Sequence, residues 1–452
     1  MFIPLEHQKQ VINRIRNQRG IVLYWTLGSG KTCASIIASD ILIDQPVYRK
    51  IYVLTPGSLR QNFISEYCEV CGKSEEYLRK YRFLTYNSNN IASKISAKKL
   101  SNSIVIVDEA HNIVNGRRNE SRQFVAVYNA IRNSKNSKII LITGTPLVTS
   151  PYEIRILIEM VRPNLLPNHE KELKELINKK PKKLSKLVSP YIFYYQNKTN
   201  LKDYPKVFKP EIIKCKLTKL QDEQYIEAEI KEKRGKFVME SNILKPNYIS
   251  IMHVMTRSIG NMAQVDDSMV SLKTIKKYST KIPHIINHVT ANKGKHVVYS
   301  FFKKRSGIMV ISKLLRLCGI NVVEFHGSLN DKERKNTLDN YNHQNNLRGE
   351  RIQVILLTSA GIEGISLKGV RFLHILEPLD SKVKESQLIG RVSRFKSHND
   401  LEKSERNVKI LMYCTVVDKS NSLSSDEILT QKAQRRWKEM EPILDILRNG
   451  HI

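Results

Sequence analysis

Short runs of apolar residues alternate with helix-like stretches in two regions of the chain, residues 1–163 and 272–424. The apolar runs are typical of strands, and strands that alternate with helices form a parallel sheet covered by helices. The sequence therefore predicts the α/β class with two tandem parallel-sheet domains. The predicted strands are 20–25, 51–54, 104–107 and 139–142 in the first region, and 296–299, 322–325, 354–357, 372–376 and 408–413 in the second.

Two other segments depart from this alternation. Residues 164–271 follow Pro163, contain fewer apolar runs and more charge, and predict a mainly helical linker or insert. Residues 425–452 predict a C-terminal helix packed on the second domain. The expected domain boundaries are thus 1–163, 164–271, 272–424 and 425–452.

The first predicted strand leads into a glycine-rich turn and then a helix from Lys31, with Ile36, Ile37 and Ile41 on its apolar face. Such a turn points backbone N–H groups at phosphates, and the helix N-terminus adds partial positive charge. Lys31 would hold the β- and γ-phosphates and Thr32 would ligate Mg²⁺. The alternative is a strand–helix turn with a chance Lys-Thr, because Trp25 stands where the phosphate-loop pattern has glycine. The turn is Gly28-Ser29-Gly30-Lys31-Thr32.

The predicted strand 104–107 ends in the acidic sequence Asp108-Glu109-Ala110-His111. Ligands bind at the carboxyl ends of strands in an open α/β sheet. Asp108 would hold the Mg²⁺ shell, and Glu109 would orient or deprotonate the attacking water. A solvated acidic turn is the alternative.

Residues 387–394, with the sequence QLIGRVSR, predict the start of a helix on which Arg391 and Arg394 share a face. Arginines placed near a γ-phosphate stabilise the charge that develops as the bond breaks. A basic surface helix in a chain rich in Lys and Arg is the alternative.

Together, these segments resemble the superfamily-2 DEAH-box helicases and their Snf2-like relatives, and the resemblance covers most of residues 1–420. Further matching motifs are LEHQ at 5–8, TPGSL at 55–59, TGTP at 143–146, SFF at 300–302, FHGS at 325–328 and TSAGIEG at 358–364. The resemblance implies two tandem RecA-like domains with ATP in the cleft between them, joined by a helical linker region.

The same resemblance implies roles for individual residues. Gln8 would read the adenine, and Asp108 and Thr32 would be the metal ligands. The implied nucleotide contacts are Gln8, Leu27, Gly28, Ser29, Gly30, Lys31, Thr32 and Gln387. The implied nucleic-acid contacts are Thr55, Pro56, Ser58, His326 and Thr358. The implied residues that couple hydrolysis to movement are Thr143, Gly144 and Thr145.

Residues 391–398 and 405–408 are similar to the transcription ATPases of large cytoplasmic DNA viruses, of the poxvirus early transcription factor and nucleoside triphosphate phosphohydrolase type. Residues 217–221 with Tyr225 resemble a linker shared with Snf2-type ATPases. This implies an ATP-dependent helicase acting on RNA or DNA in viral transcription, in the host cytoplasm or viral factory or packaged in the virion. Its partners would be nucleic acid and the viral RNA polymerase or transcription factors. A duplex translocase without strand separation and an inactive polymerase scaffold stay open as alternatives.

Composition adds three expectations. The net charge of +32 over 452 residues favours a polyanionic partner, although a solvated basic surface would give the same number. Cys68 and Cys71 lack the second pair or nearby histidine that a zinc site needs, so we expect the six cysteines to be reduced thiols. No apolar run approaches the ~20 residues of a membrane helix, so we expect no membrane partner.

Overall fold

The computed structural model describes residues 4–26, 28–196, 203–234, 237–240, 243–246, 252–362, 364–418 and 422–449. The chain forms two compact units, which are described separately. Unit 1 comprises Met1–Thr199 and Arg435–Ile452, and unit 2 comprises Asn200–Gln434. Residues 164–271 therefore contribute to both units.

Unit 1 is built on a parallel sheet with the strand order β3-β2-β4-β5-β1-β6. All four strands expected in this region are present, and β3 and β6 form the two edges. The central strands are buried along their whole length, as expected for a sheet that is covered on both faces. The strands are β1 (Gly20–Trp25), β2 (Ile51–Thr55), β3 (Tyr81–Thr85), β4 (Ile104–Val107), β5 (Lys138–Thr143) and β6 (Ile192–Tyr195).

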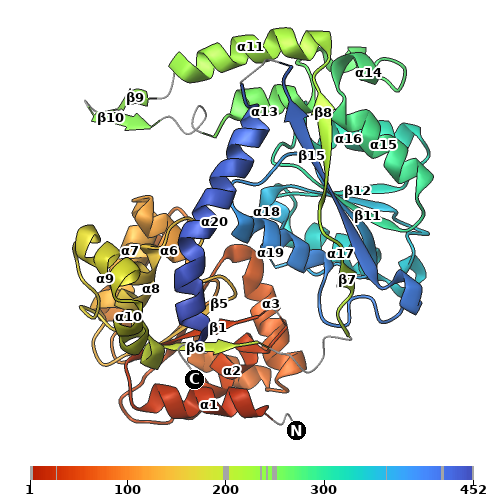
Figure 1. Ribbon diagram of the computed structural model, residues 1–452. Coiled ribbons are helices and arrows are strands. Elements are labelled where there is room, and N and C mark those ends of the chain that lie inside the picture. Colours follow the sequence, from red (N-terminus) through yellow and green to blue (C-terminus); the bar gives the residue numbers. More distant parts are fainter. Residues whose placement is uncertain are drawn as a thin grey trace. The chain divides into compact units, whose positions relative to one another are not determined.

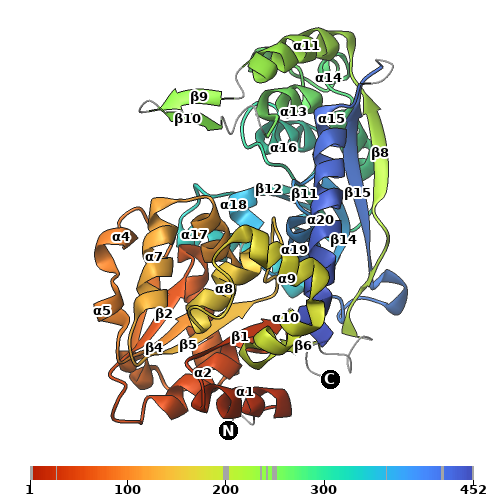
Figure 2. The ribbon, with the colours of Figure 1, turned by 60° about the vertical axis from the view of Figure 1, so that its left-hand side comes forward.

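Helices cover both faces of this sheet (Figure 2). Helices α1 (Glu6–Arg16) and α2 (Lys31–Leu42) pack on one face, and α8 (Glu153–Val161) contacts β1 and β5. In α2, Ile36 and Ile37 are buried as predicted, but Ile41 is 39% exposed because the sheet covers a narrower stripe of the helix. The other helices are α3 (Arg60–Ser65), α4 (Ile91–Lys94), α5 (Ala97–Leu100), α6 (His111–Arg118), α7 (Arg122–Asn133), α9 (Glu170–Lys179) and α10 (Pro181–Val188).

Cys33 in α2 forms a disulfide with Cys71, so the expectation of six reduced thiols is wrong for this pair. The turn Glu66–Val70 packs against α2 and places the two Cα atoms 5.8 Å apart, although 38 positions separate them in sequence. The C-x-x-C spacing in the sequence groups Cys71 with Cys68, but Cys68 is not part of the disulfide. The cysteines outside the disulfide are Cys68, Cys215, Cys318 and Cys414.

Unit 2 is built on a second parallel sheet with the order β12-β13-β11-β14-β15-β7, in which β8 also pairs with β15. All five strands expected in this region are present. A separate antiparallel hairpin joins β9 (Phe237–Glu240) to β10 (Ile243–Pro246). The sheet strands are β7 (Lys206–Val207), β8 (Glu211–Lys216), β11 (Lys295–Tyr299), β12 (Val322–Phe325), β13 (Val354–Leu357), β14 (Val370–Ile375) and β15 (Asn407–Val416).

The two faces of this sheet carry separate cores. Figure 1 shows α15 (Lys281–Ala291) and α16 (Ile308–Leu317) on one face and α17 (Asp331–Asn342) and α19 (Lys382–Val392) on the other. Alternate residues of each strand enter opposite cores, as the period of two requires. The remaining helices are α11 (Lys219–Arg234), α13 (Val254–Asn261), α14 (Ile275–Tyr278), α18 (Ser359–Ile362) and α20 (Ser425–Asn449).

Helix α20 confirms the predicted C-terminal helix but does not belong to the second domain alone. Its start is fixed in unit 2 by Lys281 Nζ and Asp426 Oδ2, which are 2.7 Å apart and fully buried. From Arg435 onward the helix belongs to unit 1, where Arg448 Nε donates to the Tyr24 hydroxyl at 3.3 Å.

Candidate nucleotide and nucleic-acid site

The turn between β1 and α2 depends on two glycines. Gly28 and Gly30 have φ values of +75° and +76°, a region that strains any residue with a side chain. Gly30 is also crowded, because a Cβ atom there would lie 2.5 Å from Gln8 Nε2. The turn therefore has the glycine-dependent backbone conformation that is typical of phosphate-binding turns.

Helix α1 supports this turn with two side chains. Gln8 Nε2 donates to the Gly30 carbonyl at 3.2 Å, and Gln8 Oε1 accepts from the Leu5 N–H at 2.8 Å. His7 Nε2 lies 3.0 Å from the Ser29 carbonyl, and its ring stacks on Tyr195 with centroids 3.7 Å apart. Burial lowers the pKa of His7, so the ring is neutral and Nε2–H is the donor. Sequence reasoning found Gln8 but missed its neighbour His7.

Lys31 lies over the turn, where its Nζ donates to the carbonyls of Trp25 and Thr26 at 2.9 Å each. Ser29 Oγ also donates to the Thr26 carbonyl, at 2.6 Å. Trp25 is the last residue of β1, and its ring is fully buried in the core. The missing glycine is thus replaced by a core residue without disturbing the turn. Thr32 lies in the first turn of α2, and Leu27 lies outside the described residues.

Asp108 and Glu109 follow the end of β4, as predicted. Burial, followed by the neighbouring Glu109 carboxylate, raises the pKa of Asp108 to about 7, although the Lys31 ammonium acts in the opposite direction. Glu109 has φ +46°, a strained value that is often found at functional sites. Two carboxylates that repel each other beside an ammonium and a phosphate-type turn are well suited to bind a divalent cation.

A side-chain relay connects this acidic turn to β5. His111 Nδ1 lies 3.4 Å from Glu109 Oε2 and 3.2 Å from Thr143 Oγ1. Thr143 Oγ1 in turn accepts from the Thr145 N–H at 3.0 Å. Tyr86, which sequence reasoning missed, supports the turn by donating from its hydroxyl to the Asp108 carbonyl at 3.1 Å. The structure therefore joins the acidic motif to the predicted coupling segment, Thr143, Gly144 and Thr145.

The predicted nucleic-acid contacts of unit 1 lie at the end of β2. Thr55 and Pro56 are buried, and Thr55 Oγ1 donates to the Pro56 carbonyl at 3.3 Å. Gly57 is exposed and donates its N–H to Asn87 Oδ1 at 3.3 Å. Ser58 lies in the turn Gly57–Leu59. Among Thr55, Pro56 and Gly57, the exposed residue is therefore Gly57.

The predicted contacts of unit 2, His326 and Thr358, follow the paired ends of β12 and β13. The Thr358 N–H donates to the Phe325 carbonyl at 3.3 Å. Burial lowers the pKa of His326, and the nearby Lys303 ammonium lowers it further. The two predicted residues thus meet at the carboxyl edge of the second sheet.

Gln387, Arg391 and Arg394 lie in and after α19, and the predicted helix start at Gln387 is wrong. The helix begins at Lys382, where Ser381 Oγ caps the Val383 N–H at 3.2 Å, and it ends at Val392. Arg391 is 6% exposed in the last turn. Arg394 lies beyond the helix in a separate turn, in which its N–H donates to Ser397 Oγ at 3.1 Å. The two arginines therefore do not share a helix face.

Comparison with known proteins assigns the family. Residues 69–290 match the SNF2-related domain, and residues 280–396 match the helicase conserved C-terminal domain. The chain belongs to the SNF2-related helicases. Its two parallel-sheet units are the tandem RecA-like domains of this family, and the protein is an ATP-hydrolysing enzyme whose activity depends on nucleic acid.

Viral proteins are among the relatives of this SNF2-related helicase. An Acanthamoeba polyphaga mimivirus protein named "Putative ATP-dependent RNA helicase" is 29% identical, over 98% of this chain and 97% of its own. An African swine fever virus protein named "Termination factor NPH-I homolog" is 25% identical, over 92% of this chain and 72% of its own. The Pyrococcus furiosus Hef helicase domain, a solved structure, is 16% identical with a TM-score of 0.48, over 95% of this chain and 98% of that one. Within the described part of the chain, no helix is both long and apolar enough to cross a bilayer.

Proposed function

We propose that this SNF2-related helicase uses Mg²⁺-ATP hydrolysis to move on or unwind nucleic acid in viral transcription. The observation that carries the proposal is a path of interactions within unit 1. Lys31 interacts electrostatically with Asp108, and hydrogen bonds and close polar contacts lead from Asp108 and Glu109 through His111 to Thr143 and Thr145. This path connects groups suited to phosphate and metal binding with a segment that can respond to hydrolysis.

The proposed chemistry assigns one task to each group in unit 1. Lys31 and the turn amides hold the phosphates, and Gln8 lies beside them to read the base. Thr32 and Asp108 are the metal ligands; Mg²⁺ would neutralise phosphate charge at this position. Glu109 orients the attacking water and accepts its proton. The raised pKa of Asp108 supports a cation at this position, because a bound cation would stabilise the ionised form.

Unit 2 supplies the remaining positive charge in this proposal. Arg391 and Arg394 act on the γ-phosphate when the two units close, and Gln387 contacts the nucleotide. Hydrolysis then releases the closed state, which is the basis of stepping. In this proposal, His111 contacts both Glu109 and Thr143 and transmits to Thr143 the structural change that hydrolysis causes at Glu109.

Nucleic acid is proposed to bind mainly through its backbone. Gly57, His326 and Thr358 lie at carboxyl edges of the two sheets, and the net charge of +32 favours a polyanion. The names of the mimivirus and African swine fever virus relatives support RNA helicase and transcription-termination roles. The proposed partners are therefore the viral RNA polymerase or transcription factors, and the proposed location is the host cytoplasm, the viral factory or the virion.

Movement along duplex without strand separation is the second candidate, favoured by the SNF2-related match over residues 69–290. That match includes the linker segment at 217–225. There Gln221 Nε2 donates to the Ile259 carbonyl at 2.7 Å, and the Tyr225 hydroxyl lies 2.8 Å from Ser425 Oγ. The linker thus ties α11 to α13 and to the start of α20 within unit 2.

The test is steady-state ATP hydrolysis by the purified full chain without polynucleotide and with single-stranded RNA, single-stranded DNA or duplex DNA. We expect stimulation by at least one polymer. Unwinding of a tailed duplex and displacement of a triplex strand are then compared on that polymer. Unwinding indicates a helicase, whereas triplex displacement alone indicates a translocase. Binding without hydrolysis on every polymer would refute the motor and favour the polymerase scaffold.

A further inference from the structure

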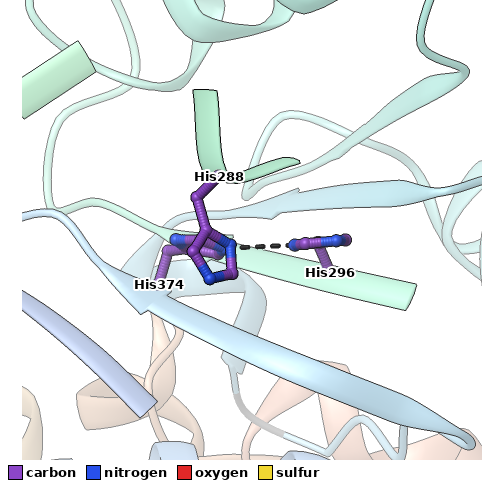
Figure 3. Close-up of side chains that lie close together, drawn as sticks. All are labelled: His288, His296 and His374. Carbon is purple, nitrogen blue, oxygen red and sulfur yellow. Dashed lines mark hydrogen bonds between the residues drawn. The ribbon is translucent and has the colours of Figure 1, made fainter. Parts of the chain in front are cut away.

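Three histidines converge in unit 2, on the sheet face that α15 covers. His296 is on β11, His374 is on β14 and His288 is on α15, and each offers a nitrogen within 4.8 Å of the others. Figure 3 shows His288 pointing from its helix toward the two strand histidines. Among the described residues, no other group of three His, Cys, Asp or Glu side chains has this arrangement. The proposed ATPase residues do not include any of them.

The hydrogen bonds of His296 fix which of its nitrogens has a lone pair. His296 Nε2 lies 3.0 Å from the Asn292 carbonyl, which can only accept, so Nε2 carries the proton. Burial lowers the pKa of His296 to about 4, so the ring is neutral and Nδ1 is unprotonated. A histidine that donates its other N–H to a backbone carbonyl is oriented as metal ligands usually are.

His374 faces this lone pair. Its Nε2 lies 3.1 Å from His296 Nδ1, a hydrogen bond in this structure, and its Nδ1 lies 2.9 Å from the Tyr413 hydroxyl. Two imidazole nitrogens on one tetrahedral ion at ~2.0–2.1 Å are separated by roughly 3.3 Å. A change of tautomer would move the His374 proton from Nε2 to Nδ1, where the Tyr413 oxygen can accept it. The nitrogen spacing is therefore close to that of two ligands on one ion, but the two rings face each other along the hydrogen bond and would have to tilt toward the ion.

His288 completes the set from the helix. Its Nδ1 is buried and has no hydrogen-bond partner among the described residues. Buried polar atoms are nearly always satisfied, so an orphan atom beside two converging imidazoles indicates an unseen partner. The ring is only partly buried, which leaves a path for an ion to enter. Burial lowers the pKa of all three histidines, so the rings are neutral, which is the form that binds metal ions.

We propose that His288, His296 and His374 bind one divalent transition-metal ion of the zinc class. Three neutral imidazoles with no carboxylate suit Zn²⁺, and three protein ligands leave a fourth position for water. The ion would clamp α15 onto β11 and β14. The site is separate from the nucleotide chemistry of unit 1, so the two proposals can fail independently.

The test uses tag-free full chain stripped of metal with a chelator. Titration with Co²⁺ should give the visible bands of a tetrahedral site with one equivalent per chain, and Zn²⁺ should abolish them. His288→Gln should weaken binding about a hundredfold or more, because a ligand is lost. His284→Gln is the matched control, since His284 is exposed one turn earlier on the same helix. Tyr413→Phe should weaken binding about tenfold through loss of the support to His374.

Circular dichroism of each variant checks folding. Among the three proposed ligands His288 is the least buried, so its substitution should disturb the fold least. Wild-type chain that gives no saturable Co²⁺ or Zn²⁺ binding would overturn the proposal. Equal affinity in His288→Gln and His284→Gln would also overturn it, because the ion would then lie elsewhere.

Discussion

The strand–helix turn after β1 in unit 1 and the one after β11 in unit 2 serve different purposes. In unit 1, Gly28 and Gly30 give the turn after β1 the backbone conformation that we propose receives the nucleotide phosphates. In unit 2, the turn after β11 is filled by the chain's own carboxylate, Glu377, which is fully buried. Glu377 accepts from the Phe301 N–H and from Ser300 Oγ. Similar strand–helix turns therefore differ in what satisfies their polar groups. The turn after β1 is the one that we propose binds a ligand, whereas the turn after β11 is held by the buried Glu377 carboxylate.

The contribution of unit 2 to catalysis gives the largest expected effect. Arg394→Ala should lower kcat about 10³-fold while nucleotide affinity changes little, because an arginine finger acts on the transition state. Steady-state kinetics together with nucleotide-binding titration would measure both quantities. Arg351→Ala, an exposed arginine of the same unit, is the control. A loss of affinity with unchanged kcat would contradict the assignment.

The disulfide should make unit 1 alone sensitive to reductant. The chain-entropy model gives about 4 kcal/mol for a loop of 38 residues. Reduction, or the Cys33→Ser substitution, should lower the free energy of unfolding of unit 1 by up to that amount and leave unit 2 unchanged. Denaturant unfolding with hydrogen exchange would resolve the units. Cys318→Ser controls for thiol removal, and equal loss in both units would refute the prediction.

Glu377→Ala removes the carboxylate that holds the turn after β11 in unit 2. The substitution leaves the Phe301 N–H, Ser300 and Asn261 without their buried acceptor, which should lower the free energy of unfolding by about 3 kcal/mol. Urea unfolding measures the change. Glu402→Ala removes an exposed carboxylate and should cost less than about 1 kcal/mol. Similar losses in the two variants would show that Glu377 does not lock the turn.

The last effect concerns the pH dependence of unit 1. The pKa of Asp108 is raised to about 7 from an ordinary value of 3.8, so the folded chain binds this proton more tightly than the unfolded chain does. The free energy of unfolding should therefore fall as pH rises from about 4 to about 7. Asp108→Asn should be more stable than wild type at pH 8, by up to about 4 kcal/mol for a shift of this size, with the gap closing toward pH 4. Thermal unfolding without metal or nucleotide measures the difference in stability between variant and wild type at each pH. The control is Asp44→Asn, an exposed position at which we expect no such difference.

Local pattern was enough to predict the central strands of both sheets and the residues at their ends, but it did not predict β3, β6, β7 and β8, of which the last three lie in the segment expected to be mainly helical. The buried runs of β1 and β4 are continuous in sequence, so they place the glycine turn and Asp108 at one sheet edge from periodicity alone. The start of α19 was predicted too late because the arginine motif begins inside the helix, whereas the cap that starts the helix is at Ser381.

Features that depend on distant segments were not visible in the sequence. Cys33 and Cys71 meet because α2 packs against a turn from another part of unit 1. The three histidines come from one helix and two strands, and no spacing rule connects them. Glu377 was missed because the donors that it satisfies belong to the turn after β11, 77 positions away in sequence at Ser300. Such sites arise from tertiary packing, which periodicity and local motifs do not encode.

The central claim is that the turn after β1 is the nucleotide site of this helicase. The most direct test is polynucleotide-stimulated ATP hydrolysis by wild type, Lys31→Ala and the exposed-lysine control Lys98→Ala. The account predicts that hydrolysis is lost in Lys31→Ala and retained in Lys98→Ala. Unchanged turnover in a folded Lys31→Ala variant would contradict it.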